Sequence, residues 1–493
     1  MSKSTSLGKD TILLTLSKMA TLVITMLTGM MLSRFRSFEE YGTYSQLNLV
    51  ITLFSSIFML GLPNSINYFL ARANSKLEQQ NFLGVYYTLS TLLSIIMGVA
   101  LALGAPLIAG YFKNPAVLSF VYFLLLYPWA SVTSSGVENI LVVYHKTRFL
   151  IVYRIIHSLL LLGAVLVVQW LGMGFREYMI INLVIHCLFG FSVYCIAYQT
   201  SGGFRPKLNG PLIRSIFAFS LPMGLATVIG TLNIEIDKLL IGYLMDTEQM
   251  AIYTNASKEL PVSFVAASIT AVLLPQLTRL LKKDKNQQAV SLWANATELS
   301  YLVICLIVAG VFTYAEDVMS LLYSEKYLPG LPVFRIYSLV LLLRCTYFGI
   351  ILNAKGKTKE IFYASLASLA LNVVLNPLMY WALGMIGPAL ATLISILVVQ
   401  QWQLFRTAKL TGVSYWQVFP YKRLGVITGC NAVLACLFYG LKLVLPLERW
   451  ISSLGESLIL GGIWCVLYLI LMRKSIKRAW NGLNQGGQND ESD

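Results

Sequence analysis

Charged residues are scarce in this chain of 493 residues. Asp, Glu, Lys and Arg make up 12% of it, hydrophobic residues make up 57%, and the mean hydropathy is +0.70. Soluble domains carry about a quarter charged residues, so this balance excludes an ordinary water-soluble protein. A net charge of +15 would suggest a nucleic-acid binder in a soluble protein, but the cations here lie in short clusters between long apolar runs. We therefore predict a membrane protein without a nucleic-acid partner.

Residues that build metal, disulfide or nucleotide sites are also few. The seven cysteines stand singly inside apolar segments, and His145, His157 and His186 show neither HExxH spacing nor clustered carboxylates. Gly356-Lys357-Thr358 resembles the end of a phosphate-binding loop, but Ile351 occupies the position where that loop requires glycine. We expect no metal, no cofactor and no ATP site.

Long hydrophobic runs are the main feature of the sequence. A hydrocarbon core about 30 Å thick needs roughly 20 apolar residues of helix. Fourteen runs meet this criterion, at about 11–33, 43–70, 82–110, 116–144, 149–171, 175–199, 214–243, 249–277, 291–314, 331–352, 360–381, 384–409, 421–446 and 451–472. The first is too long for a signal-peptide core, so we interpret it as a span. The predicted fold is all-α with about fourteen transmembrane helices and short loops.

The cations alternate between loops in a way that fixes the predicted orientation. With the N-terminus inside, cytoplasmic segments hold 24 of the 37 Lys and Arg residues. The outer loops hold six of them, namely Arg34, Arg36, Lys113, Arg176, Lys326 and Arg449. Because cytoplasmic loops retain Lys and Arg, both termini are predicted to face the cytoplasm.

Three sequence matches relate the first six spans to the next six. Residues 39–44 parallel 248–253 at an offset of 209, residues 146–147 parallel 357–358 at 211, and residues 171–173 parallel 383–385 at 212. Each half has an even number of spans, so both enter from the same side and the repeat is parallel. We predict an N-terminal six-helix lobe at 1–210, a C-terminal six-helix lobe at 211–412, and two additional helices with a polar cytoplasmic tail at 413–493.

Several stretches resemble bacterial polysaccharide exporters. They are EEYGTYSQ at 39–46, LGLPNSINYFLAR at 60–72, FSLPMG at 219–224, EIDKLLIGYL at 235–244, AIYTNASKEL at 251–260 and NAKGKTK at 353–359. Over about residues 10–410 the chain is similar to the O-antigen and capsule flippases, whose superfamily also holds the lipid II flippases and the MATE drug exporters. Fourteen helices rather than twelve is a variation that resembles the lipid II flippases.

The resemblance implies a non-enzymatic transporter in the bacterial plasma membrane. Its twelve-helix core would work by alternating access on an undecaprenyl-pyrophosphate-linked oligosaccharide, the repeat unit of an O-antigen, capsule or exopolysaccharide. Membrane lipids and other polysaccharide-assembly proteins are its expected partners.

Ionisable residues within spans indicate where the substrate would pass, because they are costly in hydrocarbon. Lys18, Arg154 and Arg344 are our candidates for contacting a pyrophosphate, since cations match its charge and the guanidinium fork matches its oxygens. Structural ion pairs, or side chains reaching toward headgroups, are the alternative explanation. Five further residues are candidates for gating or ion coupling: Glu138, Glu235, Asp237, Lys258 and Glu298.

Two of these five residues are predicted to lie at the same depth in the membrane. Glu235 and Lys258 each lie nine residues from the outer end of their helices, roughly 13 Å at about 1.5 Å per residue, so antiparallel helices would bring them level. A gate and a permanent structural pair are both consistent with that position. Pro222, Pro261 and Pro377 are expected to kink spans at hinges.

Two other functions are alternatives to a polysaccharide flippase. A MATE-like cation-coupled drug exporter resembles this plan but carries an acid in its first helix, where this chain has Lys18. A membrane polysaccharide polymerase or glycosyltransferase would present catalytic groups on an outer loop. The longest outer loop, at about 314–330, offers Glu316, Asp317 and Glu325, which we interpret as surface charges.

Overall fold

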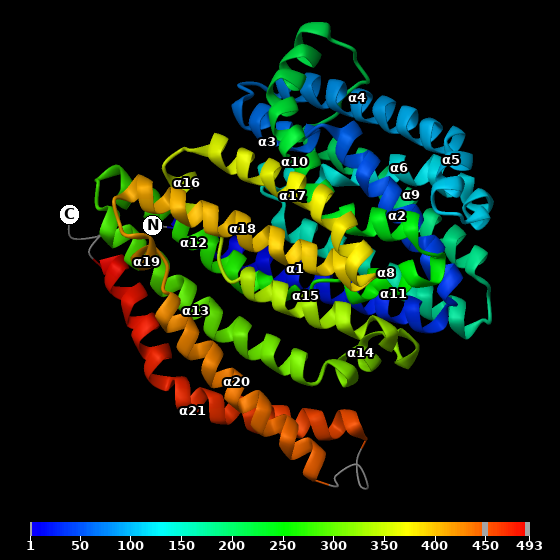
Figure 1. The fold of residues 1–493 in the computed structure, drawn as a ribbon. Helices are drawn as coiled ribbons and strands as arrows, with labels where there is room; N and C mark the ends of the chain where they lie inside the picture. The colour runs from blue at the N-terminus through cyan, green and yellow to red at the C-terminus, as the bar shows by residue number, and fades with distance from the viewer. Residues whose placement is uncertain (1, 446–451, 489–493) are drawn as a thin grey trace. The chain divides into compact units, whose positions relative to one another are not determined.

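The computed structural model describes residues 2–445 and 452–488. Within these ranges every regular element is a helix, and fourteen helical segments are long and apolar enough to cross a membrane. This confirms the predicted all-α fold and its number of spans. Figure 1 traces the elements from α1 to α21, and the chain divides into two compact units, 1–251 and 252–493.

The first unit contains the helices up to α10 and the start of α11. They are α1 (Ser2–Phe35), α2 (Phe38–Met59), α3 (Leu62–Arg72), α4 (Lys76–Leu103), α5 (Ala105–Tyr111), η1 (Pro115–Phe120), α6 (Val121–Ser135), α7 (Val137–Val143), α8 (Thr147–Trp170), α9 (Phe175–Ser201) and α10 (Gly210–Leu244). A capping box starts α2: Ser37 Oγ accepts from the Glu40 amide, and the Glu40 carboxylate accepts from the Ser37 amide.

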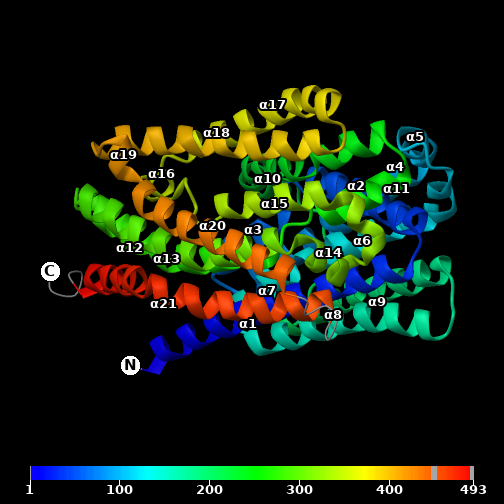
Figure 2. The same ribbon diagram turned by 60° about the horizontal axis from the view of Figure 1, so that its bottom comes forward.

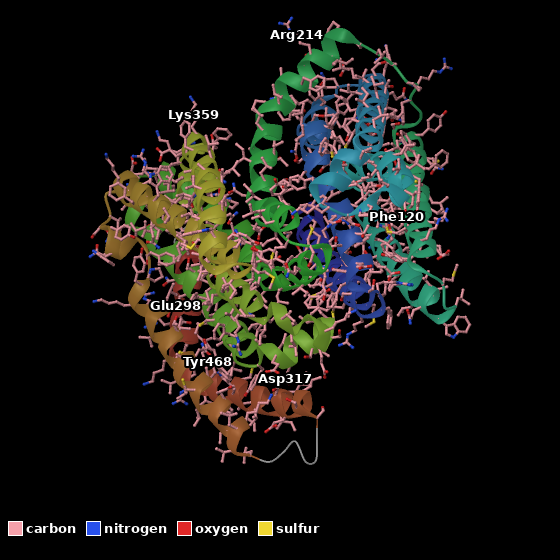
Figure 3. All side chains as sticks on the ribbon, turned by 45° about the vertical axis from the view of Figure 1, so that its right-hand side comes forward. Phe120, Arg214, Glu298, Asp317, Lys359 and Tyr468 are labelled. Atoms are coloured by element: carbon pink, nitrogen blue, oxygen red, sulfur yellow. The ribbon has the colours of Figure 1, made fainter. Side chains whose placement is uncertain are left out.

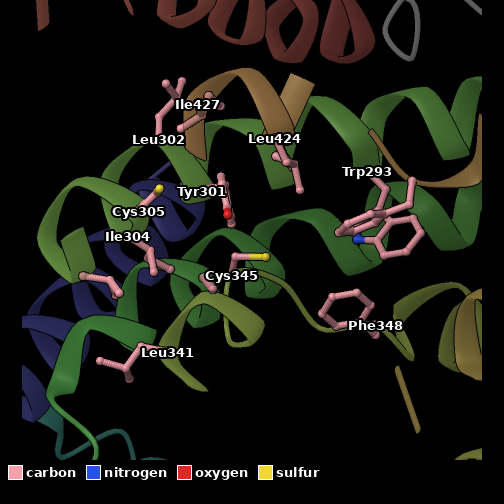
Figure 4. Close-up of a cluster of buried hydrophobic side chains, with 14 of the residues drawn as sticks. Trp293, Tyr301, Leu302, Ile304, Cys305, Leu341, Cys345, Phe348, Leu424 and Ile427 are labelled. Atoms are coloured by element: carbon pink, nitrogen blue, oxygen red, sulfur yellow. The ribbon is translucent and has the colours of Figure 1, made fainter. Parts of the chain in front are cut away.

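The second unit begins within α11 and includes the two additional helices. Its elements are α11 (Thr247–Ala256), η2 (Pro261–Ser263), α12 (Phe264–Lys282), α13 (Asn286–Thr313), α14 (Ala315–Tyr323), η3 (Glu325–Gly330), α15 (Leu331–Leu343), α16 (Ile350–Ala354), α17 (Thr358–Leu383), α18 (Ile386–Thr411), α19 (Tyr415–Val418), α20 (Tyr421–Val444) and α21 (Ser453–Gln488). Figure 4 shows part of its buried core, where Trp293, Tyr301 and Cys345 gather with residues of α20 such as Leu424.

The order of the elements repeats between the units. Helices α5, η1, α8 and α9 have counterparts in α14, η3, α17 and α18, which begin 210 or 211 residues later. The turns repeat as well, because Gly172 and Gly202, which have positive φ, correspond to Gly384 and Gly412, which also have positive φ. His145 adopts a positive φ where the second unit has Gly356. The boundary at 210/211 follows sequence similarity, whereas the two compact units follow contacts, so that boundary stays a prediction.

Five of the runs interpreted as single spans are interrupted helices. The chain breaks at Leu60–Gly61, at Gly104, at Gly136, at 257–263 and at 344–349. Of the three prolines expected at kinks, Pro261 begins η2 within such a break. Pro222 and Pro377 lie inside α10 and α17, which continue as helices past them. Irregular backbone at membrane depth is tolerated where protein or a cavity satisfies its polar groups, which draws attention to these breaks.

Candidate functional site

Lys18, Glu138 and Arg154 form one ion cluster in the first unit. Lys18 Nζ on α1 lies 2.8 Å from Glu138 Oε1 on α7, and Arg154 Nη2 on α8 pairs with Glu138 Oε2. The Lys18 side chain is 49% exposed, whereas the Arg154 side chain is 17% exposed. Two cations therefore share one carboxylate, and the cluster carries surplus positive charge.

Arg154 has donor capacity left over. Its Nη1 is buried and meets no hydrogen-bond acceptor within the described residues. A buried donor without an acceptor is unfavourable, so this nitrogen is suited to receive an oxygen from a bound anion. The sequence predicts Lys18 and Arg154 as candidate cations and Glu138 as a candidate for gating or coupling, but it does not predict that both cations pair with Glu138.

Arg344 and Glu259 form a second ion pair, in the second unit. Arg344 follows the last residue of α15, and Glu259 precedes η2, so both lie where a helix is interrupted. Arg344 Nη2 donates to Glu259 Oε1 at 2.9 Å, and the two side chains are 38% and 32% exposed. Transporter binding sites are commonly formed at such discontinuous helices.

Glu259 is absent from the residues predicted from sequence to form the site. A signal for it was present, because Glu259 stands two residues before Pro261, and proline disfavours helix in the residue before it. An acidic residue in an interrupted span needs a cation, and Arg344 was one of the three cations predicted from the sequence.

Glu235 and Asp237 both lie on α10. Glu235 Oε2 is 2.8 Å from Lys238 Nζ on the same helix. Asp237 is 2% exposed, and its Oδ1 accepts from the Lys238 amide at 2.7 Å. Lys258 belongs to the other compact unit, so the predicted Glu235–Lys258 pair stays a prediction. Among residues 2–445 and 452–488, no three His, Cys, Asp or Glu side chains group as metal ligands.

Glu298 lies inside the second unit and binds the two additional helices. Its side chain is fully buried on α13. Arg423 Nη1 on α20 lies 3.0 Å from Glu298 Oε2, and Arg478 on α21 pairs with Oε1. Arg423 Nη1 also donates to Asn295 Oδ1 at 2.9 Å. These contacts place Glu298 where α20 and α21 attach to α13, and its role in gating or coupling stays a prediction.

The structure shows that our interpretation of Asp317 in the outer loop was wrong. It is not a surface charge: its side chain is only 10% exposed, and it pairs with Lys442 of α20. Ser453 and Ser457 of α21 donate to its two carboxylate oxygens at 2.7 and 2.6 Å. Burial acts to raise the pKa of Asp317, but the hydrogen bonds from Lys442, Ser457 and Ser453 outweigh it and hold that pKa below its ordinary value.

The additional helices are thus tied to the rest of the second unit at two polar clusters. Figure 3 labels Glu298 and Asp317 at separate points, with Tyr468 of α21 between them in the view. Tyr468 donates to the Leu302 carbonyl of α13 at 2.9 Å. Each cluster draws cations or donors from both α20 and α21.

Two of the stretches typical of polysaccharide exporters pack against each other. Gly61 at the α2–α3 break has a left-handed φ of 73°, and a Cβ there would lie 2.8 Å from the Gly224 amide nitrogen on α10. A Cβ on Gly224 would in turn lie 2.2 Å from the Leu60 carbonyl carbon. Only glycine permits both this φ and this backbone approach. Helix α10 therefore packs directly against the backbone at Leu60–Gly61, between α2 and α3.

Fourteen candidate spans, several of them interrupted, define a polytopic helical membrane protein. Comparisons with known proteins make the class more specific. The model of the polysaccharide biosynthesis protein family matches residues 31–332. That match covers more than half of the chain, so the chain belongs to this family.

Curated relatives have distant sequences. The probable low-salt glycan biosynthesis flippase Agl15 of Haloferax volcanii is 20% identical over 242 residues, covering 48% of this chain and 50% of that protein. The teichuronic acid biosynthesis protein TuaB of Bacillus subtilis is 22% identical over 287 residues, covering 57% and 58%. The chain spans about half to three fifths of the length of such relatives.

Solved structures share the fold. The lipid II flippase MurJ in an inward closed conformation matches with a TM-score of 0.76 at 16% identity, covering 94% of this chain and all of that chain. An inward-facing MATE multidrug transporter matches with a TM-score of 0.61 at 14% identity, covering 80% and 96%. The chain is therefore a multi-pass helical membrane protein with the fold that lipid II flippases and MATE transporters share.

Proposed function

We propose that this chain flips an undecaprenyl-pyrophosphate-linked oligosaccharide across a bacterial plasma membrane by alternating access. Its membership in the polysaccharide biosynthesis protein family supports this proposal. The names of its relatives support it too, since they include glycan, capsule and teichuronic acid biosynthesis proteins. The substrate is the repeat unit of an O-antigen, a capsule or an exopolysaccharide, and other polysaccharide-assembly proteins supply and consume it.

The cluster of Lys18, Glu138 and Arg154 is the observation that carries the proposal. Lys18 is half exposed on a span, and a charge facing hydrocarbon would be costly, so we place it against a hydrated path. With two cations on one carboxylate, the path is positive there, which suits a pyrophosphate and not a cationic drug. Arg344 provides a second phosphate contact when its guanidinium turns from Glu259.

The transporter needs no ATP, and the membrane potential assists it. Each charge moved through 100 mV is worth about 2.3 kcal/mol, so a pyrophosphate carrying about two negative charges gains roughly 4–5 kcal/mol on leaving an inside-negative cell. Asp237 and Glu235 provide the alternative route, in which an inward proton or sodium ion drives export.

Liposome reconstitution tests the proposal directly. A fluorescent lipid-linked oligosaccharide is placed in one leaflet, and its appearance in the other is followed under an imposed potential without an ion gradient. Flipping that responds to the size and sign of the potential supports the electrogenic mechanism. Flipping that ignores the potential directs the search for coupling to Asp237 and Glu235, and an absence of flipping contradicts the proposed function.

Cytoplasmic termini complete the proposed topology. The cation bias between loops supports them. A cysteine tag appended after Asp493, which lies outside the described residues, is expected to resist labelling by a membrane-impermeant reagent in intact cells. Labelling from outside would contradict this orientation.

A further inference from the structure

A polar cavity lies where the twelve-helix repeat joins the two additional helices. Its volume is about 360 Å³, and twelve residues line it: Gln287, Val290, Ser291, Ala294, Val413, Trp416, Gln417, Phe419, Pro420, Tyr421, Lys422 and Arg423. The short helix α19 forms part of its wall, and Figure 2 shows α19 at the junction of α18 and α20. Since α18 ends at Thr411 and α20 begins at Tyr421, the cavity lies at the ends of two candidate spans, where we expect lipid headgroups.

The cavity carries unused positive charge. Lys422 is exposed and has no hydrogen-bond or ion-pair partner within residues 2–445 and 452–488. Arg423 uses only Nη1 in its bonds to Glu298 and Asn295, so the rest of its guanidinium fork remains available. Glu298 is the nearby carboxylate, and Arg478 shares it. Arg423 and Arg478 thus share one carboxylate, and Lys422 beside Arg423 in the lining has none, so an anion would balance the surplus positive charge.

Aromatic side chains hold one indole at the rim of the cavity. Trp416 is 74% exposed, yet its ring contacts Tyr415 and Tyr421 with centroids 5.3 and 5.7 Å away. Tyr421 is itself fixed by donating to Gln401 Oε1 at 2.9 Å. A rigid exposed Trp beside basic residues is typical of the membrane–water interface, where indole rings lie among headgroups.

We propose that this cavity binds the phosphate headgroup of an anionic membrane phospholipid. Lys422 and the free part of the Arg423 guanidinium contact the phosphate oxygens, while Trp416 packs against the glycerol and upper acyl region. Gln287, Ser291 and Gln417 provide polar side chains for the headgroup hydroxyls. The bound lipid thereby neutralises the surplus charge around Glu298 and stabilises the attachment of α20 and α21.

Lipid binding is measurable on the whole protein. Purified chain is incorporated into nanodiscs of phosphatidylcholine with increasing phosphatidylglycerol, and retained lipid is identified by native mass spectrometry. Retention of phosphatidylglycerol over phosphatidylcholine is expected. K422Q should weaken that preference about fivefold, the effect of roughly one basic residue near an anionic headgroup. W416A combined with K422Q should weaken it further.

K359Q is the matched control. Lys359 is an exposed lysine of the same unit that does not line the cavity, so its loss should leave retention unchanged. Equal retention of both lipids, or equal effects of K422Q and K359Q, would overturn the proposal. Displacement of the phospholipid by millimolar inorganic pyrophosphate would also overturn it, because the site would then select a pyrophosphate group such as that of the substrate.

Discussion

Both units contain a carboxylate shared by two cations, yet the two clusters differ in exposure and in origin. Glu138 is 35% exposed, and its partners Lys18 and Arg154 come from helices within the repeat. Glu298 is fully buried, and its partners Arg423 and Arg478 come from the two helices outside the repeat. The same charge pattern thus occurs in a partly exposed cluster within the repeat and in a fully buried cluster at the attachment of α20 and α21.

The comparison shows that the formal charge of an intramembrane residue does not determine its role. A buried carboxylate needs its cations permanently, because leaving it unpaired is strongly unfavourable. A half-exposed carboxylate can release a cation to an incoming anion, because water solvates it in the meantime. Exposure of the carboxylate therefore distinguishes the two cases.

Removing both cations of the accessible cluster should have the largest effect. K18Q with R154Q should lower flipping on the order of 100-fold, because two charge-assisted contacts worth about 1.5 kcal/mol each are lost. Thermal unfolding in detergent should change little. The measurement is flipping in liposomes at equal protein density, and a doubly substituted protein that flips normally would assign the cluster a structural role.

Removing both cations of the buried cluster should instead affect stability. R423M with R478M leaves Glu298 without a counter-charge, and we expect the folded protein to lose about 3–5 kcal/mol. Adding E298Q should restore most of that loss, since no buried charge then remains. Unfolding of the three proteins, followed by loss of monodisperse protein on heating, distinguishes this rescue from general damage; an unrescued triple variant would contradict the anchoring role.

Removing the cation of the polar cluster around Asp317 should cause a smaller loss of stability, and that loss should depend on pH. K442M removes the cation of Asp317 and should destabilise the protein by about 1–3 kcal/mol near neutral pH, whereas K442R should retain most of the stability. The pKa of Asp317 is lowered from 3.8 in the folded state. Its stabilisation is therefore fully present above that value and lost as the pH falls through the folded pKa. Unfolding temperatures of wild type and K442M should converge in strong acid; a constant difference down to that pH would argue against this assignment.

The smallest effect is expected at a partly exposed ion pair between α17 and α18, whose Arg406 and Glu360 side chains are 35% and 21% exposed. Arg406 of α18 donates Nε and Nη2 to both carboxylate oxygens of Glu360 on α17, at 2.8 Å each. Solvent screens this pair, so R406Q should alter neither flipping nor unfolding measurably. A clear loss of flipping would show that exposure alone does not separate functional from structural charges.

The spans were predictable because a hydrophobic run of about 20 residues has the length of a helix that crosses a bilayer. The breaks were not, since Leu60 and Gly61 interrupt an apolar run without lowering its hydropathy. The charged residues within spans marked Lys18, Glu138 and Arg154 as candidates, but a linear sequence gives no helix rotation and so no pairing. Partners distant in sequence, such as Arg478 for Glu298, depend on packing among α13, α20 and α21.

The attachment of α20 and α21 also determines the order of steps during synthesis and membrane assembly. Glu298 precedes its partners by 125 residues for Arg423 and 180 residues for Arg478. At about 5–20 residues per second, the ribosome needs roughly 6–25 s to reach the first arginine and 9–36 s to reach the second. During that interval α13 carries an acidic side chain whose counter-ions have not been synthesised. The nascent chain therefore passes through a stage in which Glu298 lacks both of its arginines, and its burial against α20 and α21 is one of the last steps of assembly.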